Sequence, residues 1–229
     1  MPNSRFLLSL PDDIQNILKP QLETLVLSHG EIMLAAGELI DYIYFPTDSL
    51  ISMVVTLENG NTVEAATIGN DGFAGIAAFF GGYRAEVTAV VQIPGEALRL
   101  DVSVFRKLME NERFREVTGN YAARIFATVA QSAACLAFHP VHERLARWLL
   151  LVRDCTEHSE FPLTQDFIAV MLGVHRPTVT IAMRLLESAG LVEHRRGRIR
   201  IVDADALTEA ACECYRLSGT MRSNARSES

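Results

Sequence analysis

The residues with the clearest chemistry in this 229-residue sequence lie between Gly173 and Ile201. Six arginines and only two glutamates in this stretch leave a local charge of +4, in a chain whose formal net charge is −7. Guanidinium groups pair with phosphates, and their planar fork also fits the edge of a guanine base. The acidic total argues against nucleic-acid binding, but the regional excess indicates a phosphate-binding face. The arginines are Arg176, Arg184, Arg195, Arg196, Arg198 and Arg200.

A second group of reactive side chains lies in the middle of the chain. Cys135, His139 and His142 are residue types that ligate metal ions. Pro140 lies among them, and we expect it to break the helical face that they would have to share. We therefore predict ordinary packing and capping for these side chains, and no metal site.

The remaining cysteines concern redox chemistry. Cys212-x-Cys214 is expected in an acidic final helix, where the pair could respond to oxidation, although a structural role is the simpler interpretation. An iron–sulfur cluster needs about four thiolates, and no cysteine precedes Cys135, so we predict no iron–sulfur cluster. Four cysteines are too few for a disulfide framework, which favours a reducing, cytoplasmic location.

Motifs of enzymes and membrane proteins are missing from the sequence. It contains no nucleophile elbow, P-loop, Gly-x-Gly-x-x-Gly or His-Glu-x-x-His motif, so we expect no enzyme. Apolar stretches such as Leu145–Val152 are broken by charge well before the ~18 residues that a membrane span needs. The first ten residues show no apolar run followed by a small-residue cleavage site, so we expect no secretory signal. We expect a soluble, cytoplasmic protein with no membrane partner.

The elements that must position the arginines are two short helices. The segment from Leu163 to Val174 predicts a helix capped by Thr164 and stopped at Gly173. A second helix begins near Arg176-Pro177, where proline is tolerated at the first position, and ends at Gly190. This spacing is typical of a helix-turn-helix, although any helical hairpin could show it. Its expected apolar face is Val179, Ala182, Met183 and Leu186.

A short hairpin follows these helices. Leu191–His194 and Ile199–Ile201 are predicted strands, and Arg195-Arg196-Gly197-Arg198 joins them. A hairpin that carries three arginines beside a helix-turn-helix makes a winged module, whose wing can lie against phosphates. The combination favours DNA binding over a merely solvated charged face.

The first hundred residues have the pattern of an antiparallel β domain. Short β-rich runs recur from Gly30 to Leu100 without helical crossovers, which indicates a sandwich, jelly roll or barrel. Asn59-Gly60 is the sharpest hairpin signal, because its turn needs positive φ. The expected strands are Glu31–Ala35, Tyr42–Phe45, Leu50–Leu57, Thr62–Ile68 and Val87–Ile93.

A long helix joins the two parts. After a plausible N-cap at Asp101, helical periodicity predicts an uninterrupted helix from about Arg113 to Ala137, which Pro140 ends. The apolar or small-residue stripe along this helix is either a core face or a coiled-coil-like dimer seam. A second helix should follow, with Leu145, Trp148, Leu149 and Val152 inward and Arg144, Arg147 and Arg153 outward. The stripe comprises Phe114, Val117, Tyr121, Ile125, Val129, Ser132 and Leu136.

These segments together resemble the Crp/Fnr family of bacterial transcription regulators over most of the chain. The segment from His139-Pro140-Val141-His142-Glu143-Arg144 through Ile201 carries the more specific likeness. The turns at Gly30-Glu31, Gly37-Glu38, Gly60, Gly69 and Gly72-Phe73-Ala74-Gly75 are similar to those of a cyclic-nucleotide-binding jelly roll. The implied fold class is α+β. It comprises a sensory β jelly roll over residues 1–110, a long dimerisation helix over 111–138 and a winged helix-turn-helix over 139–229.

The resemblance implies a homodimer that binds double-stranded DNA, with a recognition helix over about 176–189 in the major groove of a palindromic site. Arg176 occupies the family's base-reading arginine position. Pro177 and Ile181 depart from the family pattern, so the preferred site should differ from the best-known consensus; Ile181 could contact a thymine methyl. The candidate DNA-binding residues are His175, Arg176, Thr178, Thr180, Ile181, Arg184, Arg195, Arg196 and Arg198.

The same resemblance places a candidate effector pocket after the glycine-rich turn. Phe73 stands where nucleotide-binding members carry a glutamate for the ribose hydroxyl, and Tyr83-Arg84 stands where their Arg-Ser pair binds the cyclic phosphate. Phenylalanine cannot accept that hydroxyl, so we predict that cyclic AMP is not a standard ligand. Arg84 could still meet an anion, and a pocket lined by Phe73, Phe79 and Phe80 could hold an apolar effector or be filled core. The candidate pocket residues are Gly72, Phe73, Gly75, Tyr83 and Arg84.

The preferred interpretation is a regulator whose N-terminal domain modulates DNA binding or contacts RNA polymerase. Two alternatives stay open. One is a ligand-sensing module that acts on a protein partner, and the other is a regulator that responds to a cyclic nucleotide. Neither the effector, nor the operator, nor the direction of regulation follows from the sequence.

Overall fold

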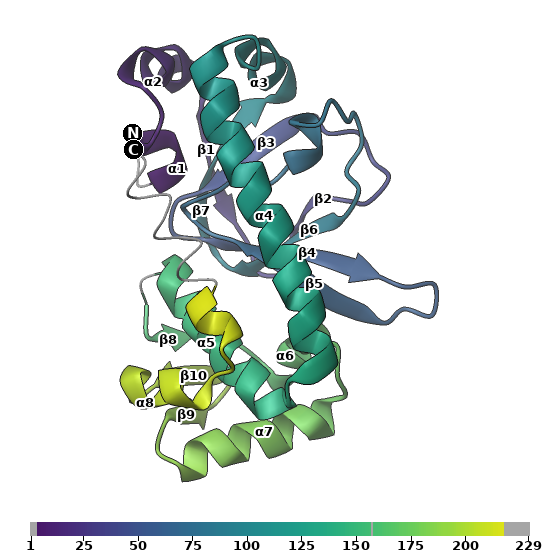
Figure 1. Ribbon diagram of the computed structural model, residues 1–229, viewed down its shortest axis with the longest axis vertical. Helices are drawn as coiled ribbons and strands as arrows, with labels where there is room; N and C mark the ends of the chain where they lie inside the picture. Colours follow the sequence, from purple (N-terminus) through teal and green to yellow (C-terminus); the bar gives the residue numbers. More distant parts are fainter. Residues whose placement is uncertain (1–3, 157, 218–229) are drawn as a thin grey trace. The chain divides into compact units, whose positions relative to one another are not determined.

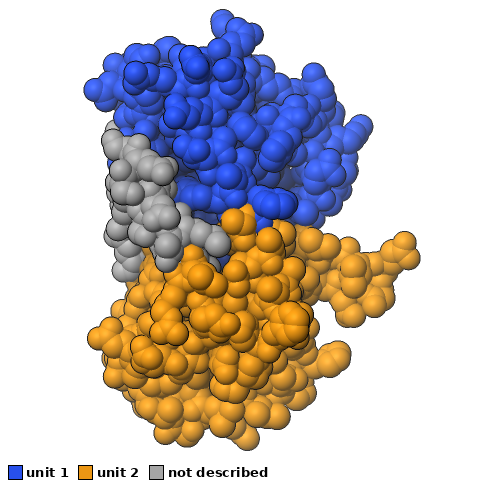
Figure 2. All heavy atoms as spheres, viewed as in Figure 1, with its two compact units in different colours: residues 1–53, 67–126, 229 blue, residues 54–66, 127–228 orange. Residues whose placement is uncertain are grey.

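The computed structural model of the chain describes residues 4–156 and 158–217 (Figure 1). They divide into two compact units, coloured separately in Figure 2. Of the described residues, the first unit contains 4–53 and 67–126, and the second contains 54–66, 127–156 and 158–217. The second unit therefore includes the end of one β-hairpin from the N-terminal half of the chain.

The N-terminal half of the chain forms two sheets of an antiparallel β domain. One sheet has the order β1-β7-β3 and the other β2-β6-β4-β5. β7 pairs antiparallel with β1 and β3, and β6 pairs antiparallel with β2. The five strands expected from the sequence are present within one or two residues, whereas β1 and β7 were not expected. The strands are β1 (Glu23–Leu27), β2 (Ile32–Leu34), β3 (Tyr42–Pro46), β4 (Leu50–Thr56), β5 (Thr62–Ile68), β6 (Thr88–Ile93) and β7 (Gly95–Asp101).

Local turn and cap chemistry explains several of these boundaries. Gly60 has φ 84° between β4 and β5, as the Asn59-Gly60 signal predicts. The carboxylate of Asp101 accepts a hydrogen bond of 2.8 Å from the main-chain N–H of Ser103, which caps α3. The helical segments of the first unit besides α4 are α1 (Arg5–Leu8), α2 (Asp12–Leu18), η1 (Lys19–Gln21), η2 (Ile76–Ala78) and α3 (Val102–Leu108).

Helix α4 (Glu112–Phe138) has the length that the periodicity predicts. The expected stripe is mainly a core face, since Phe114, Tyr121, Ile125 and Ser132 are buried by the chain itself, whereas Leu136 is exposed. By length and composition α4 could also cross a membrane, but charges at its start and its buried stripe fit a helix of a folded domain. Only 17% of its most apolar window is buried, so a second, apolar face remains uncovered.

The second unit is a set of helices with a small sheet. Its elements are α5 (Val141–Thr156), β8 (Glu160–Phe161), α6 (Gln165–Leu172), α7 (Arg176–Ser188), β9 (Val192–Arg195), β10 (Arg198–Ile201) and α8 (Ala204–Ala210). The sheet order is β8-β10-β9, with β10 antiparallel to both neighbours. The predicted helices and wing strands are confirmed, while the two-residue strand β8 was not expected.

Two expectations about this unit are wrong, and a third holds only in part. Arg144 and Arg147 on α5 were expected outward, but they are only 7% and 8% exposed, because α5 packs against α6, α7 and α8. Pro140 does divide His142, on α5, from Cys135 and His139, as expected, but these two still share a face, since the N–H of His139 donates to the Cys135 carbonyl (3.1 Å). Cys212 does not lie within the final helix, because α8 ends at Ala210; Cys214 begins the helical turn that follows.

Candidate nucleic-acid interface

The turn between α6 and α7 is fixed by local hydrogen bonds. At the start of α6 the hydroxyl of Thr164 accepts a hydrogen bond of 3.2 Å from the N–H of Phe167. At its end Gly173 has φ 62°, a left-handed conformation that glycine adopts without steric cost, and the N–H of Val174 returns to the Ala169 carbonyl (3.0 Å). The chain can therefore turn sharply from α6 into α7.

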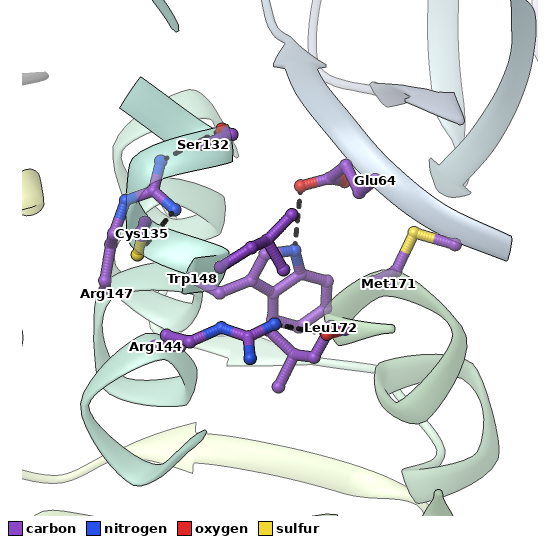
Figure 3. A pocket seen from close by; sticks show the side chains of 9 residues that line it. Glu64, Ser132, Cys135, Arg144, Arg147, Trp148, Met171 and Leu172 are labelled. Carbon is purple, nitrogen blue, oxygen red and sulfur yellow. Dashed lines mark hydrogen bonds between the residues drawn. The ribbon is translucent and has the colours of Figure 1, made fainter. Parts of the chain in front are cut away.

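A buried arginine from α5 completes the end of α6. The Nη2 of Arg144 donates a hydrogen bond to the carbonyl of Leu172, the last residue of α6 (Figure 3). A positive charge at a helix C-terminus interacts favourably with the helix dipole. Burial lowers the pKa of this guanidinium, which still remains charged at neutral pH because arginine starts so high. Sequence reasoning missed this role, since nothing near Arg144 marks a partner on another helix.

The second unit also holds the β4–β5 hairpin end against the helix-turn-helix. The indole Nε1 of Trp148 donates to Glu64 Oε1 at 3.0 Å (Figure 3). A methyl group at Gly173 would come within 2.9 Å of Val63 Cγ2, so this glycine is also needed for close approach. The hairpin end thereby contacts both α5 and the turn that sets the angle of α7.

Helix α7 divides cleanly into two faces. Its buried side chains are the four that the sequence predicts, Val179, Ala182, Met183 and Leu186. The opposite face is exposed and mixes positive charge with apolar surface, including Ile181, which is 63% exposed although it is a large aliphatic residue. An aliphatic side chain as exposed as Ile181 in a cationic face fits contact with a thymine methyl group, and Leu185 is also exposed, at 51%. The exposed residues of the helix and its cap are His175, Arg176, Pro177, Ile181, Arg184, Leu185 and Ser188.

The predicted threonines differ in their surroundings. Thr180 is half-buried, and its hydroxyl donates to Gln165 Oε1 at 2.7 Å, on the first helix of the motif. Gln165 in turn lies 3.4 Å from His194 Nδ1, on the wing strand β9. Thr180 therefore joins α7 to α6, a role that competes with the predicted contact to DNA. Thr178 is half-buried at the start of the helix, and its contact with DNA stays a prediction.

Arg176 stands at the first position of α7 and is 64% exposed at its side chain. Its Nε lies 3.5 Å from a carboxylate oxygen of Asp166, on the first turn of α6, which is equally exposed. An ion pair in water is worth about 0–1 kcal/mol. The guanidinium is therefore oriented at little cost and can exchange this partner for a base edge.

The arginines of the wing differ in whether they form ion pairs. Arg196 and Gly197 have φ values of 50° and 74°, as a tight type I′ hairpin turn requires. Arg198 pairs with Glu160 on β8, and Arg200 pairs with Glu193 at 3.0 Å. Arg195 and Arg196 are exposed and form no ion pair with any carboxylate of the described chain. The tip of the wing thus carries the unneutralised charge, and Arg198, a predicted DNA contact, is already partnered.

The predicted effector pocket is largely closed by aromatic packing. Phe73 is fully buried and lies 4.6–5.7 Å, centroid to centroid, from four other rings. Tyr121 on α4 donates its hydroxyl hydrogen to the Phe73 carbonyl at 2.8 Å, and Gly72 leaves the space that its ring occupies. Of the two interpretations of this phenylalanine, filled core therefore fits the structure. The four rings belong to Phe6, Phe45, Phe105 and Tyr121.

The other candidate pocket residues lie near the surface or in turns. Gly75 has φ 107° and would meet Ile43 if it carried a side chain. Tyr83 is exposed, with the Arg106 guanidinium 4.1 Å from its ring centroid. Arg84 is exposed and donates to the Gly37 carbonyl at 2.7 Å. Phe73 thus does not line an open site together with Arg84.

Comparisons of the sequence with protein families agree with this architecture. Residues 24–112 match the model of the cyclic nucleotide-binding domain, and residues 143–210 match the model of the Crp-like helix-turn-helix domain. No curated protein sequence matches the chain significantly.

Solved structures share the fold of most of the chain. A Crp/Fnr-family transcriptional regulator from Eubacterium rectale is 18% identical, with a TM-score of 0.70 over 90% of this chain and 97% of that one. FixK2 from Bradyrhizobium japonicum is 16% identical, with a TM-score of 0.71 over 83% and 98%. The c-di-GMP responsive regulator CLP of Xanthomonas campestris is 15% identical, with a TM-score of 0.67 over 83% and 98%.

Proposed function

The chain belongs to the Crp/Fnr family of transcription regulators, and we propose that it acts as a homodimer that reads a palindromic duplex through α7. The observation that carries the proposal is the exposed face of α7. Arg176 and Ile181 are exposed on this face, and we expect them to contact bases, one a guanine and the other a thymine methyl. Arg184 and the wing tip supply charge for the flanking phosphates.

The uncovered face of α4 supports the dimer. Ala123, Ala130 and Ala137 are exposed and recur every seven residues, and Phe126 and Ala133 are exposed at the intervening positions. This is the a/d spacing of a coiled-coil seam, with small residues that allow close approach. Phe126 is 75% exposed in the single chain, and a second copy of α4 would cover it. A two-fold dimer then sets two α7 helices about 34 Å apart, one turn of DNA.

We further propose that the first unit does not use cyclic AMP as its standard ligand. Phe73 fills the position of the ribose-binding carboxylate, and its burial among aromatic rings leaves no acceptor for a ribose hydroxyl there. An unpaired buried hydroxyl would cost about 1–3 kcal/mol. The unit would then regulate DNA binding through another signal or through its contacts alone.

Selection of binding sites from a random duplex pool, with and without cyclic AMP, tests the function. We expect the purified full chain to enrich a palindrome equally in both arms. Arg176→Ala should weaken binding to that site by about 1–3 kcal/mol and relax the preference at one base pair of each half-site. Lys107→Ala, which removes an exposed charge from α3, is the matched control and should keep both affinity and preference. No enrichment by the wild type, or equal affinity for all duplexes, would refute the proposal.

A further inference from the structure

Four potential metal ligands that are far apart in the sequence lie together in the second unit. They are Cys135 and His139 at the end of α4, and Cys212 and Cys214 after α8. One ligand atom from each lies within 4.8 Å of every other. All three cysteines are buried, and His139 is half-buried. Because α4 continues hydrogen-bonded through His139, Cys135 and His139 are one turn apart on the same side.

The spacing of these atoms is that of ligands around a single small ion. Cys135 Sγ lies 3.6 Å from Cys212 Sγ, and Cys214 Sγ lies 3.5 Å from His139 Nδ1. Tetrahedral zinc, with Zn–S of about 2.3 Å and Zn–N of about 2.0 Å, sets two sulfurs about 3.8 Å apart and a sulfur and nitrogen about 3.5 Å apart. An iron–sulfur cluster distributes its ligands over several iron atoms, and so needs them farther apart than these.

We propose that Cys135, His139, Cys212 and Cys214 bind one Zn²⁺ ion in a closed, tetrahedral structural site. Three thiolates and one imidazole are a ligand set typical of structural zinc. All four positions would be filled by protein, so no place remains for a water or substrate. The expected role is to tie the segment after α8 to the end of α4, beside the α5 helix that supports α6.

The groups around the four ligands fit this role. The Nε2 of His139 lies 3.1 Å from Glu213 Oε2, which leaves Nδ1 as the ligand atom that faces the sulfurs. A carboxylate that orients the second nitrogen of a ligating histidine is the usual outer-shell arrangement at zinc. Gln131 Nε2 donates to Cys214 Sγ at 2.9 Å, as a hydrogen bond to a ligating thiolate would require.

The charge balance gives an independent argument. Three thiolates and a neutral histidine around Zn²⁺ carry one net negative charge. Arg147 is buried, with Nη1 3.8 Å from Cys135 Sγ and Nη2 3.5 Å from Ser132 Oγ. It pairs with no carboxylate of the described residues, and an unpaired buried charge is costly. The zinc–thiolate complex would be its counterion.

A disulfide between Cys135 and Cys212 is the competing chemistry, since their sulfurs lie 3.6 Å apart. It would use neither Cys214 nor His139, and it would not explain the Glu213 contact. It would also remove the thiolate charge that faces Arg147. The four-ligand arrangement with its partners favours the metal.

The test begins with the metal content of the full chain, purified under reducing conditions from cells supplied with zinc. We expect one equivalent of zinc per chain by elemental analysis. Replacement by Co²⁺ should produce the visible absorption bands of a tetrahedral cobalt–thiolate centre, which needs no variant that could misfold. Protein without bound zinc, with a Cys135–Cys212 disulfide, or with iron and inorganic sulfide in place of zinc would overturn the proposal.

Matched variants assign the ligands. Cys135→Ala, Cys214→Ala and His139→Ala should each lose most of the bound zinc. Cys155→Ala, which changes a buried cysteine outside the cluster, and His142→Ala should keep the full equivalent. Glu213→Gln should keep the ion but weaken its binding about 10–100-fold in a chelator competition. Equal zinc content in Cys135→Ala, Cys155→Ala and the wild type would refute the assignment.

Discussion

The guanidinium of Arg144 donates a hydrogen bond to the carbonyl of Leu172, although the two residues lie 28 positions apart. Leu172 is the last residue of α6, directly before the glycine that turns the chain into α7. The contact therefore fixes the end of one helix of the DNA-binding motif to α5. It links the stability of the second unit to the orientation of α7, whose exposed face we propose to contact DNA.

Arg144→Met should destabilise the chain by about 1–3 kcal/mol, because the buried Leu172 carbonyl loses its donor while the apolar stem is kept. The measurement is chemical denaturation followed by circular dichroism. Arg184→Met removes an exposed arginine of α7 and should change the unfolding free energy by less than about 0.5 kcal/mol. Identical midpoints for the two variants would show that the contact is not stabilising.

Substitutions of an unpaired and of a paired wing arginine should have different effects on the salt dependence of DNA binding. Arg196→Asn removes an exposed, unpaired charge, and asparagine tolerates the positive φ of 50° at this position. Each phosphate contact contributes close to one unit to the slope of log K against log salt, so this variant should lower the slope by about 1. Arg198→Gln should change it less, because Arg198 is paired with Glu160. Fluorescence anisotropy at several salt concentrations measures both, and a larger effect at Arg198 would contradict the assignment.

Phe126→Asp should convert the dimer to a monomer. It introduces a charge into the exposed α4 face without disturbing the packing of a single chain, because the side chain is exposed. Sedimentation velocity gives the oligomeric state. Phe80→Asp makes the same change at another exposed phenylalanine, 71% exposed, and should remain dimeric. A dimer in both variants would mean that α4 does not supply the interface.

Cyclic AMP should not stabilise the protein. A ligand at a hundred times its dissociation constant would add about 2.7 kcal/mol, which a thermal unfolding curve detects easily. Phe73→Ala should itself cost about 3–5 kcal/mol, because Phe73 is a fully buried member of the aromatic core. Phe80→Ala should change the free energy of unfolding little, because Phe80 is 71% exposed. A clear upward shift of the wild-type melting temperature with cyclic AMP would contradict the interpretation of Phe73 as core.

Elements with a local signal could be predicted closely. The Asn59-Gly60 turn, the cap at Thr164, the stop at Gly173 and the buried face of α7 agree with the structure. Each depends on interactions within a few residues, where backbone sterics and helical periodicity dominate. β1 was missed because its residues are mostly exposed, so its pattern lacks an apolar face.

Helical periodicity predicted side-chain burial poorly where several other elements pack around one helix. The arginines of α5 were assigned to the outside because they are charged, but Arg144 and Arg147 are buried. Arg144 donates to the Leu172 carbonyl on α6, and Arg147 donates to Ser132 on α4. The apolar stripe of α4 was recognised, but whether it faced the chain or a partner was left open. The structure assigns most of it to the core and leaves the alanine-rich face uncovered.

The amino-acid sequence by itself determined the β-rich N-terminal part, the long helix, the winged helix-turn-helix and the arginines of its exposed face. Only the tertiary structure decided which side chains meet. Cys135 and Cys212 are 77 positions apart, and no pattern along the chain indicates that their sulfurs approach to 3.6 Å. Local signals arise from steric and hydrogen-bonding rules that act between near neighbours. Contacts of this range depend on how whole elements pack, so a cluster such as Cys135, His139, Cys212 and Cys214 becomes visible only in the fold.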